Sequence, residues 1–201
     1  MDRLTRPRRK RRLPRVPRFT KVQEFIETSV DRPQKALLAL MLYGVLRRSE
    51  VVSLNVEDFV ADFGLRRVKG KGDKEDAVPL TEAVRRIIAQ YLSNDRKTAR
   101  AGDPMFVVRY RTRGGEWCER RMADHRVWKI IKALGRREGV IQLHPHAFRH
   151  SSAVELLRRS RNLRAVQAHL RHSDIQTTTV YTEMTQSELQ KVVTLFDEDG
   201  K

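Results

Sequence analysis

The sequence is poor in cysteine and has no long apolar run. Its 201 residues include one cysteine, Cys118, which excludes an internal disulfide and fits a reducing environment. No apolar stretch approaches the ~20 residues that a membrane-spanning helix needs. The first residues lack the apolar core of a signal peptide, so we expect no export. Together these features predict a cytoplasmic protein.

Acidic side chains are also scarce relative to basic ones. Lys and Arg number 42 and Asp and Glu 25, which gives a formal net charge of +17. Such an excess attracts polyanions and favours their binding through counterion release. DNA, RNA and acidic membrane surfaces are all candidates. The alternative is a charged surface that serves only to keep the protein dispersed.

Much of this charge lies in residues 1–18. They contain nine Lys or Arg, one Asp and three prolines, with few apolar residues to bury. This composition predicts a disordered arm or interdomain linker that follows a nucleic-acid backbone, or only an artificial chain end. The residues expected to contact DNA here are Arg8, Arg9, Lys10, Arg11 and Arg12.

Apolar periodicity predicts an α+β domain that is mainly α, over residues 19–201. Thr20 and Gln23 suggest a capping box at the first helix, before an apolar stripe. Further helices are expected at 33–46, 49–54, after Thr81, and at 122–138, 145–159, 162–170 and 186–196. Strands 65–69 and 76–80 flank a turn-rich segment and predict a hairpin with Lys71 near its tip, and 106–108 predicts one more short strand.

The segment around residue 146 carries the first candidate chemistry. His146, Arg149 and His150 share one face at the start of the helix expected after Pro145. A guanidinium between two imidazoles suits a phosphate, because Arg offers a planar fork of donors and His can shuttle a proton. A metal site with His144 is an alternative, although Arg149 opposes a cation and no cysteine or carboxylate lies nearby. Purely structural histidines are a second alternative.

The second candidate segment runs from His172 to Tyr181. The two residues are nine positions apart and are joined by a Thr-rich stretch of low helix propensity. Such a stretch suits a mobile segment. A nucleophile that must reach a phosphate and then release it would gain from that mobility, and Tyr181 is the candidate.

Four segments in this order resemble the tyrosine recombinases, the family of phage and integron integrases and bacterial Xer recombinases. They are LYGVLRRSE at 42–50 with Leu54, GKGDKE at 70–75 with VPL at 78–80, HAFRH at 146–150, and LRHSDIQTTTVYT at 170–182. The resemblance covers roughly residues 19–185. It implies the catalytic-domain fold of that family and a site-specific recombinase or integrase that cleaves and rejoins DNA through a 3′-phosphotyrosine.

The resemblance also implies catalytic roles. Tyr181 would be the nucleophile and Lys71 the general acid that protonates the leaving 5′ oxygen. His146 would position the phosphate and relay protons, and His172 would donate to a phosphate oxygen. The two arginines would be Arg47 and Arg149, with Arg47 preferred to Arg48 because Arg48 fills a position that is usually apolar. Two guanidiniums and an imidazole can stabilise the developing charge without a metal, and the tyrosine link conserves bond energy. We therefore expect no cofactor, neither ATP nor Mg²⁺.

Three positions depart from the family pattern. Arg171 and Ser160 stand where glycine is common, and Glu183 stands where histidine is frequent. Arg171 is expected either to crowd the active site or to contact the DNA backbone. Lys69 and Lys74 are also expected to contact DNA.

The resemblance further implies partners and alternatives. Double-stranded DNA and a homotetramer on two duplexes are expected, with a monomer when free and nucleoid association in the cytoplasm. An apolar stripe over residues 189–196 would dock on a neighbour or pack on its own core. The N-terminal core-binding domain of relatives is expected to be absent, as in a fragment or a natural single-domain form. A silent DNA-binding regulator and a type IB topoisomerase-like enzyme are the alternative functions.

Overall fold

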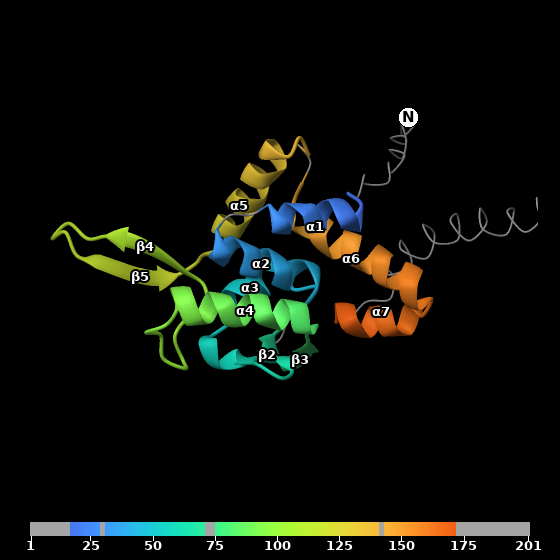
Figure 1. Ribbon diagram of the computed structural model, residues 1–201, viewed down its shortest axis with the longest axis horizontal. Coiled ribbons are helices and arrows are strands. Elements are labelled where there is room, and N and C mark those ends of the chain that lie inside the picture. Colours follow the sequence, from blue (N-terminus) through green and yellow to red (C-terminus); the bar gives the residue numbers. More distant parts are fainter. Residues whose placement is uncertain (1–16, 29–30, 71–74, 141–142, 172–201) are drawn as a thin grey trace, which may run out of the picture.

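The computed structural model describes residues 17–28, 31–70, 75–140 and 143–171. Within these ranges the chain is mainly helical, with two small antiparallel sheets (Figure 1). The elements in chain order are α1 (Phe19–Glu27), α2 (Arg32–Leu42), α3 (Arg48–Ser53), the 3₁₀ turn η1 (Val56–Asp58), β1 (Phe59–Val60), β2 (Gly64–Lys69), β3 (Glu75–Pro79), α4 (Glu82–Asp95), β4 (Val107–Arg111), β5 (Trp117–Arg121), α5 (Asp124–Arg137), α6 (Pro145–Ser160) and α7 (Leu163–Leu170).

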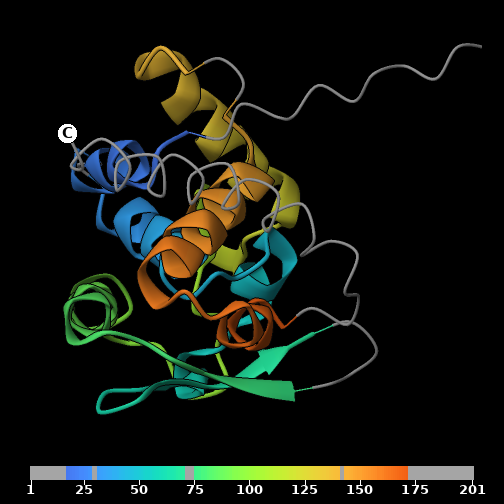
Figure 2. The same ribbon diagram turned by 90° about the vertical axis from the view of Figure 1, so that its right-hand side faces the viewer.

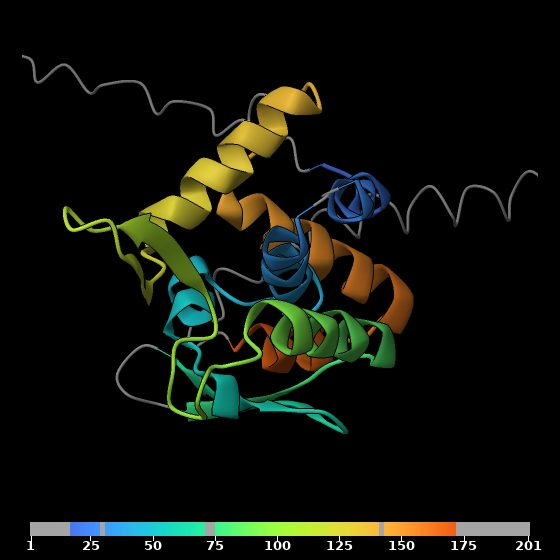
Figure 3. The ribbon, with the colours of Figure 1, turned by 60° about the vertical axis from the view of Figure 1, so that its left-hand side comes forward.

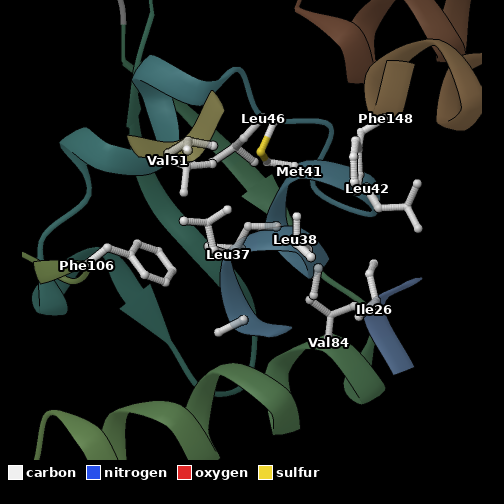
Figure 4. Close-up of a cluster of buried hydrophobic side chains, with 14 of the residues drawn as sticks. Ile26, Leu37, Leu38, Met41, Leu42, Leu46, Val51, Val84, Phe106 and Phe148 are labelled. Atoms are coloured by element: carbon white, nitrogen blue, oxygen red, sulfur yellow. The ribbon is translucent and has the colours of Figure 1, made fainter. Parts of the chain in front are cut away.

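Helix α2 lies at the centre of the fold. Pro33 stands in its first turn, where its missing N–H costs nothing. Every residue from 36 to 42 is at most 1% exposed, so the helix is apolar on all sides rather than amphipathic. Helices α1, α4 and α6 pack around it, and Figure 4 shows Leu37 and Leu38 surrounded by side chains from several elements. This core fixes the position of the turn that follows α2.

The predicted hairpin is confirmed to within one residue at each end. Strands β1, β2 and β3 form an antiparallel sheet in that order, and Lys69 pairs with Glu75 next to the turn that joins β2 and β3. Gly64 opens β2 with φ +133°, a conformation that side chains rarely adopt. The turn that carries Lys71 and Lys74 lies outside the described residues.

A second hairpin, β4–β5, differs from the sequence prediction. Only 106–108 was expected as a strand, whereas β4 extends to Arg111 and pairs in full with β5. The β4–β5 ribbon projects from the body of the molecule (Figures 1 and 3). Most of its residues are exposed, so neither face of the ribbon is buried. Because neither face is buried, the apolar alternation that signals a strand is missing. Helix α5 consequently begins at Asp124 rather than at 122.

Two helix ends were also predicted wrongly. Helix α1 begins one residue before Thr20 and its cap is Arg18, so the expected capping box does not form, and Gln23 instead donates to the Tyr43 hydroxyl over 2.9 Å. Helix α2 ends at Leu42 rather than 46, because Val45 adopts a left-handed φ of 51° and turns the chain. The expected helix at 186–196 lies outside the described residues.

Helix α7 packs on the far end of α6 through a small separate cluster. Val45, Ala153, Leu157, Val166 and Leu170 are buried together there. The turn after α2 thus contributes to the contact between the two last described helices. None of the described helices is long and apolar enough to cross a membrane.

Candidate active site

A pocket of about 230 Å³ opens where the start of α3 meets the start of α6. Its lining residues are Leu46, Arg47, Arg48, Ser49, Pro145, His146 and Arg149. The fold therefore brings the predicted site residue Arg47 to His146 and Arg149, which lie about a hundred positions later in the chain. Three guanidiniums, of Arg47, Arg48 and Arg149, and the imidazole of His146 form a strongly basic, hydrogen-bond-donating pocket that suits an anion.

Arg47 is fixed by a buried carboxylate. It caps α3, and Glu50 in the first turn accepts from the Arg47 backbone N–H at 2.8 Å and from Nη1 of its guanidinium at 2.6 Å. Glu50 is only 3% exposed. Burial alone would raise the pKa of Glu50, but the charge of Arg171 and the bonds from Arg47 outweigh it and lower that pKa. Glu50 is a site residue for which the sequence motifs predicted no role.

Arg149 is buried between three segments of the fold. Its side chain, from the second turn of α6, donates to the carbonyl of Val45 at 2.5 Å and to that of Leu170 at the end of α7. The residue is 5% exposed. These bonds join the turn after α2 to the C-terminal end of α7 and set the orientation of the Arg149 guanidinium.

Arg171 is turned inward. It is the C-cap of α7, in a left-handed conformation with φ 50°, and its side chain is 9% exposed. Nη2 lies 2.6 Å from Oε2 of Glu50. The structure thus places the Arg171 side chain beside Glu50. The expected contact of Arg171 with the DNA backbone stays a prediction.

The histidines of α6 favour their neutral forms. Burial, together with the positive charges of Arg149, Arg48 and Arg47, lowers the pKa of His146. Burial and neighbouring cationic groups likewise lower the pKa values of His144 and His150. A neutral imidazole can accept a proton as well as donate one. In the described part of the chain, no group of three His, Cys, Asp or Glu residues could hold a metal ion.

Helix α3 is held in place by Arg121, another residue for which the sequence motifs predicted no role. From the end of β5 it donates to the carbonyls of Val52 and Leu54 at 2.8 and 3.0 Å, and to the Asn55 side chain at 2.5 Å. The bond to Val52 serves a carbonyl in the last turn of α3, where carbonyls have no partner within the helix, and the Leu54 carbonyl also accepts from the Met105 N–H at 2.9 Å. No signal in the sequence could have found the Arg121 contact, because it spans more than 65 residues and belongs to the hairpin that was not predicted.

The model of the phage integrase family matches residues 18–188. The chain belongs to this family. Among its relatives, this integrase-family protein is 35% identical over 193 residues to tyrosine recombinase XerD of Oceanobacillus iheyensis, covering 92% of this chain and 62% of the relative. It is 34% identical over 199 residues to tyrosine recombinase XerC of Pseudomonas fluorescens, covering 96% and 63%. The chain thus spans slightly less than two thirds of these relatives' length.

Solved structures have the same fold as this integrase-family chain. XerA recombinase superposes with a TM-score of 0.74 at 25% identity, covering 96% of this chain and 67% of that one. The integrase of mycobacterium phage Brujita gives 0.67 at 25% identity, covering 92% and 58%. A XerH recombinase bound to its palindromic difH substrate, in a post-cleavage complex, gives 0.70 at 21% identity, covering 92% and 54%. The expected tyrosine recombinase catalytic-domain fold is therefore confirmed.

The remaining predicted site residues of this integrase-family chain are less fully placed. Lys69 ends β2 and is exposed, opposite Glu75. Arg48, beside Arg47, pairs with Asp124 of α5 at 3.2 Å and shares the same pocket. The predicted residues that lie outside the described ranges are Arg8, Arg9, Lys10, Arg11, Arg12, Lys71, Lys74, His172 and Tyr181.

Proposed function

We propose that this chain is the catalytic part of a site-specific tyrosine recombinase, which cleaves and rejoins DNA through a 3′-phosphotyrosine at Tyr181. The observation that carries the proposal is the pocket that gathers Arg47, His146 and Arg149 in a member of the phage integrase family. The basic arm and the net charge of +17 are consistent with a DNA substrate.

In the proposed reaction the Tyr181 oxygen attacks the phosphorus of one phosphodiester. The phosphorus–5′ oxygen bond breaks, the phenol gives up its proton, and the leaving 5′ oxygen receives a proton from Lys71. Rejoining is the reverse, with a 5′ hydroxyl displacing the tyrosine. The bond energy is kept in the phosphotyrosine, so no nucleotide is consumed.

The described residues supply charge stabilisation for this step. Negative charge grows on the non-bridging oxygens in the transition state, and guanidiniums fixed in advance stabilise it without reorganising. The Glu50 carboxylate holds the Arg47 guanidinium through a hydrogen bond of 2.6 Å from Nη1. The backbone carbonyls of Val45 and Leu170 hold the Arg149 guanidinium. His146, whose pKa is lowered chiefly by burial, is suited to relay the phenol proton near neutral pH.

The proposed partners follow from the same chemistry. The arm at 1–18 would run along a DNA backbone as an interdomain linker, with Lys69 and Lys74 making further backbone contacts, ahead of a catalytic domain at 19–201. Four protomers would act on two duplexes, in the cytoplasm and at the nucleoid. A sequence-independent charge term would dominate affinity, so binding should weaken steeply with salt.

Trapping the covalent intermediate tests the proposal. The full chain is mixed with supercoiled plasmid carrying a library of genomic fragments, quenched with detergent, and DNA that stays bound to protein after denaturation is recovered. Tyr181→Phe should abolish the adduct, and Arg149→Ala should slow it by ~10²–10³-fold, as for a lost transition-state donor. Tyr110→Phe is the matched control, because Tyr110 is exposed on the β4–β5 ribbon.

The outcomes separate the alternatives. An adduct that needs Tyr181 and gathers at one sequence supports the recombinase. Relaxation of supercoils at any sequence would indicate a topoisomerase-like enzyme. DNA binding without any adduct, also after fusion to a core-binding domain, would indicate a silent regulator and overturn the proposal.

A further inference from the structure

Arg171 stands in a backbone conformation that disfavours side chains. The described residues include three with positive φ that are not glycine, namely Val45, Arg161 and Arg171, at 51°, 50° and 50°. In the left-handed region the Cβ crowds the following carbonyl, and glycine is the residue that avoids this cost. A large charged side chain at such a corner therefore needs compensating contacts.

Arg171 makes those contacts to two different parts of the fold. Its Nη2 lies 2.6 Å from Oε2 of Glu50, and its Nη1 lies 3.5 Å from the carbonyl oxygen of Gly44 in the turn before α3. Its Nε lies 4.0 Å from a carboxylate oxygen of Asp76 on β3. Figure 2 shows the end of α7 beside this sheet. One side chain thus bridges α7, α3 and the lysine-bearing hairpin.

The carboxylate that Arg171 binds is the one that orients Arg47. Glu50 is 3% exposed and receives Arg47 Nη1 at 2.6 Å on Oε1 and the Arg47 backbone N–H at 2.8 Å on Oε2. The two guanidiniums therefore share one buried carboxylate. A shared, desolvated acceptor couples their positions, because moving one cation changes the field that holds the other.

The same corner is also held by Arg149. The carbonyl of Leu170, the residue before Arg171, accepts from the Arg149 guanidinium. Both predicted catalytic arginines are thus linked to the point where α7 ends, one through the backbone and the other through Glu50. From that point the chain continues to His172 and Tyr181.

We propose that Arg171 is a positioning residue that locks the end of α7 to the Glu50–Arg47 pair and to β3, so that Arg47 and the end of α7 keep a fixed relation. The inference rests on the proposed function. It is an alternative to the expectation that Arg171 contacts DNA. A glycine at this position would relax the backbone but would lose the bridge.

The test compares three variants of the full chain. Arg171→Gly removes the bridge, Arg171→Lys keeps a cation, and Arg161→Gly removes an arginine with the same φ at an exposed helix end, the C-cap of α6. DNA affinity and the rate of adduct formation at saturating DNA are measured separately. Arg171→Gly should lower the saturating rate by ~10–100-fold, as expected for slight misplacement of reacting groups, with little change in affinity. Arg171→Lys should recover part of the rate, and Arg161→Gly should match the wild type.

Two results would overturn the inference. One is an Arg171→Gly variant with wild-type saturating rate. The other is an Arg171→Gly variant that binds DNA more weakly but forms the adduct at the wild-type rate once DNA is saturating, which would make Arg171 a DNA contact. Thermal unfolding followed by circular dichroism checks that each variant folds. If Arg171→Gly does not fold, Asp76→Asn and Arg171→Lys carry the same comparison, and wild-type rates in both overturn the inference.

A second readout does not depend on DNA cleavage. The pKa of Glu50, followed by NMR at its carboxyl carbon, should rise in Arg171→Gly, because of the two arginines that lower it only Arg47 remains. The other charged group near Arg171 is Asp76 on β3, which lies 4.0 Å from the Arg171 Nε. An unmoved titration contradicts the bridge. Absence of any adduct in the wild type, with this shift present, would count against the proposed function and leave the bridge standing.

Discussion

Replacing Glu50 by glutamine tests the centre of the site most directly. The change keeps the size of the side chain but turns one acceptor into an N–H₂ donor, which then faces the donors of Arg47 or Arg171. Three bonds of 2.6–2.8 Å converge on the carboxylate in the native protein. Substitution should therefore leave a cation without its counterion.

The expected loss follows from the burial of the three groups. Removing one partner of a buried ion pair typically costs about 3–5 kcal/mol. Arg47, whose side chain is 37% exposed, can regain water, whereas Arg171 at 9% cannot. We therefore expect the lower end, about 3 kcal/mol of unfolding free energy. For a chain of this size, about 2–4 °C accompanies each kcal/mol, which predicts a fall in Tm of about 6–12 °C.

The loss should also depend on pH in a defined direction. The pKa of Glu50 is lowered in the folded state relative to an ordinary value of about 4.3. The carboxylate therefore stabilises the fold fully above that ordinary value, and its contribution disappears as pH falls through the folded pKa. The difference between wild type and Glu50→Gln should persist from pH 7 to pH 5 and shrink below about pH 4.

Thermal and urea unfolding by circular dichroism at several pH values measure this effect. Glu82→Gln is the control, because the Glu82–Arg86 pair is long at 3.6 Å and more than 70% exposed on both sides. Such pairs contribute little, so the control should be close to wild type. A fall in Tm as small as the control's, or a difference that does not shrink in acid, would refute the role assigned to Glu50.

Two further predictions concern the sheet and the pocket. Gly64→Ala should cost about 2–3 kcal/mol by urea unfolding, because a Cβ at φ +133° would lie 2.7 Å from the Leu80 nitrogen and the Val78 oxygen. Gly102→Ala, with nothing within 4 Å, is its control, and equal midpoints for the two variants would contradict the prediction. His146 should titrate below 6.5 by NMR, and Arg48→Gln should raise its midpoint by removing a nearby positive charge. A wild-type midpoint at or above 6.5 would show that burial and charge do not act as described.

Local pattern was sufficient for much of the fold. The apolar run of α2, Pro145 at the start of α6 and the turn between β2 and β3 each act within a few residues, so these elements were predicted close to their observed positions, apart from the end of α2, where Val45 turns the chain. The exposed β4–β5 ribbon was missed for the opposite reason, since it buries neither face and leaves no apolar period to detect.

The sequence by itself determined the family, the order of its motifs and the residue types that the chemistry needs, because these depend on identity and spacing along the chain. Only the tertiary structure decided which groups meet. The pocket joins Arg47 to His146 and Arg149 across about a hundred residues, and Glu50 pairs with Arg171 across 121. Long-range pairing of this kind is set by how helices pack around α2, and a linear pattern does not encode the direction in which a side chain such as Arg171 turns.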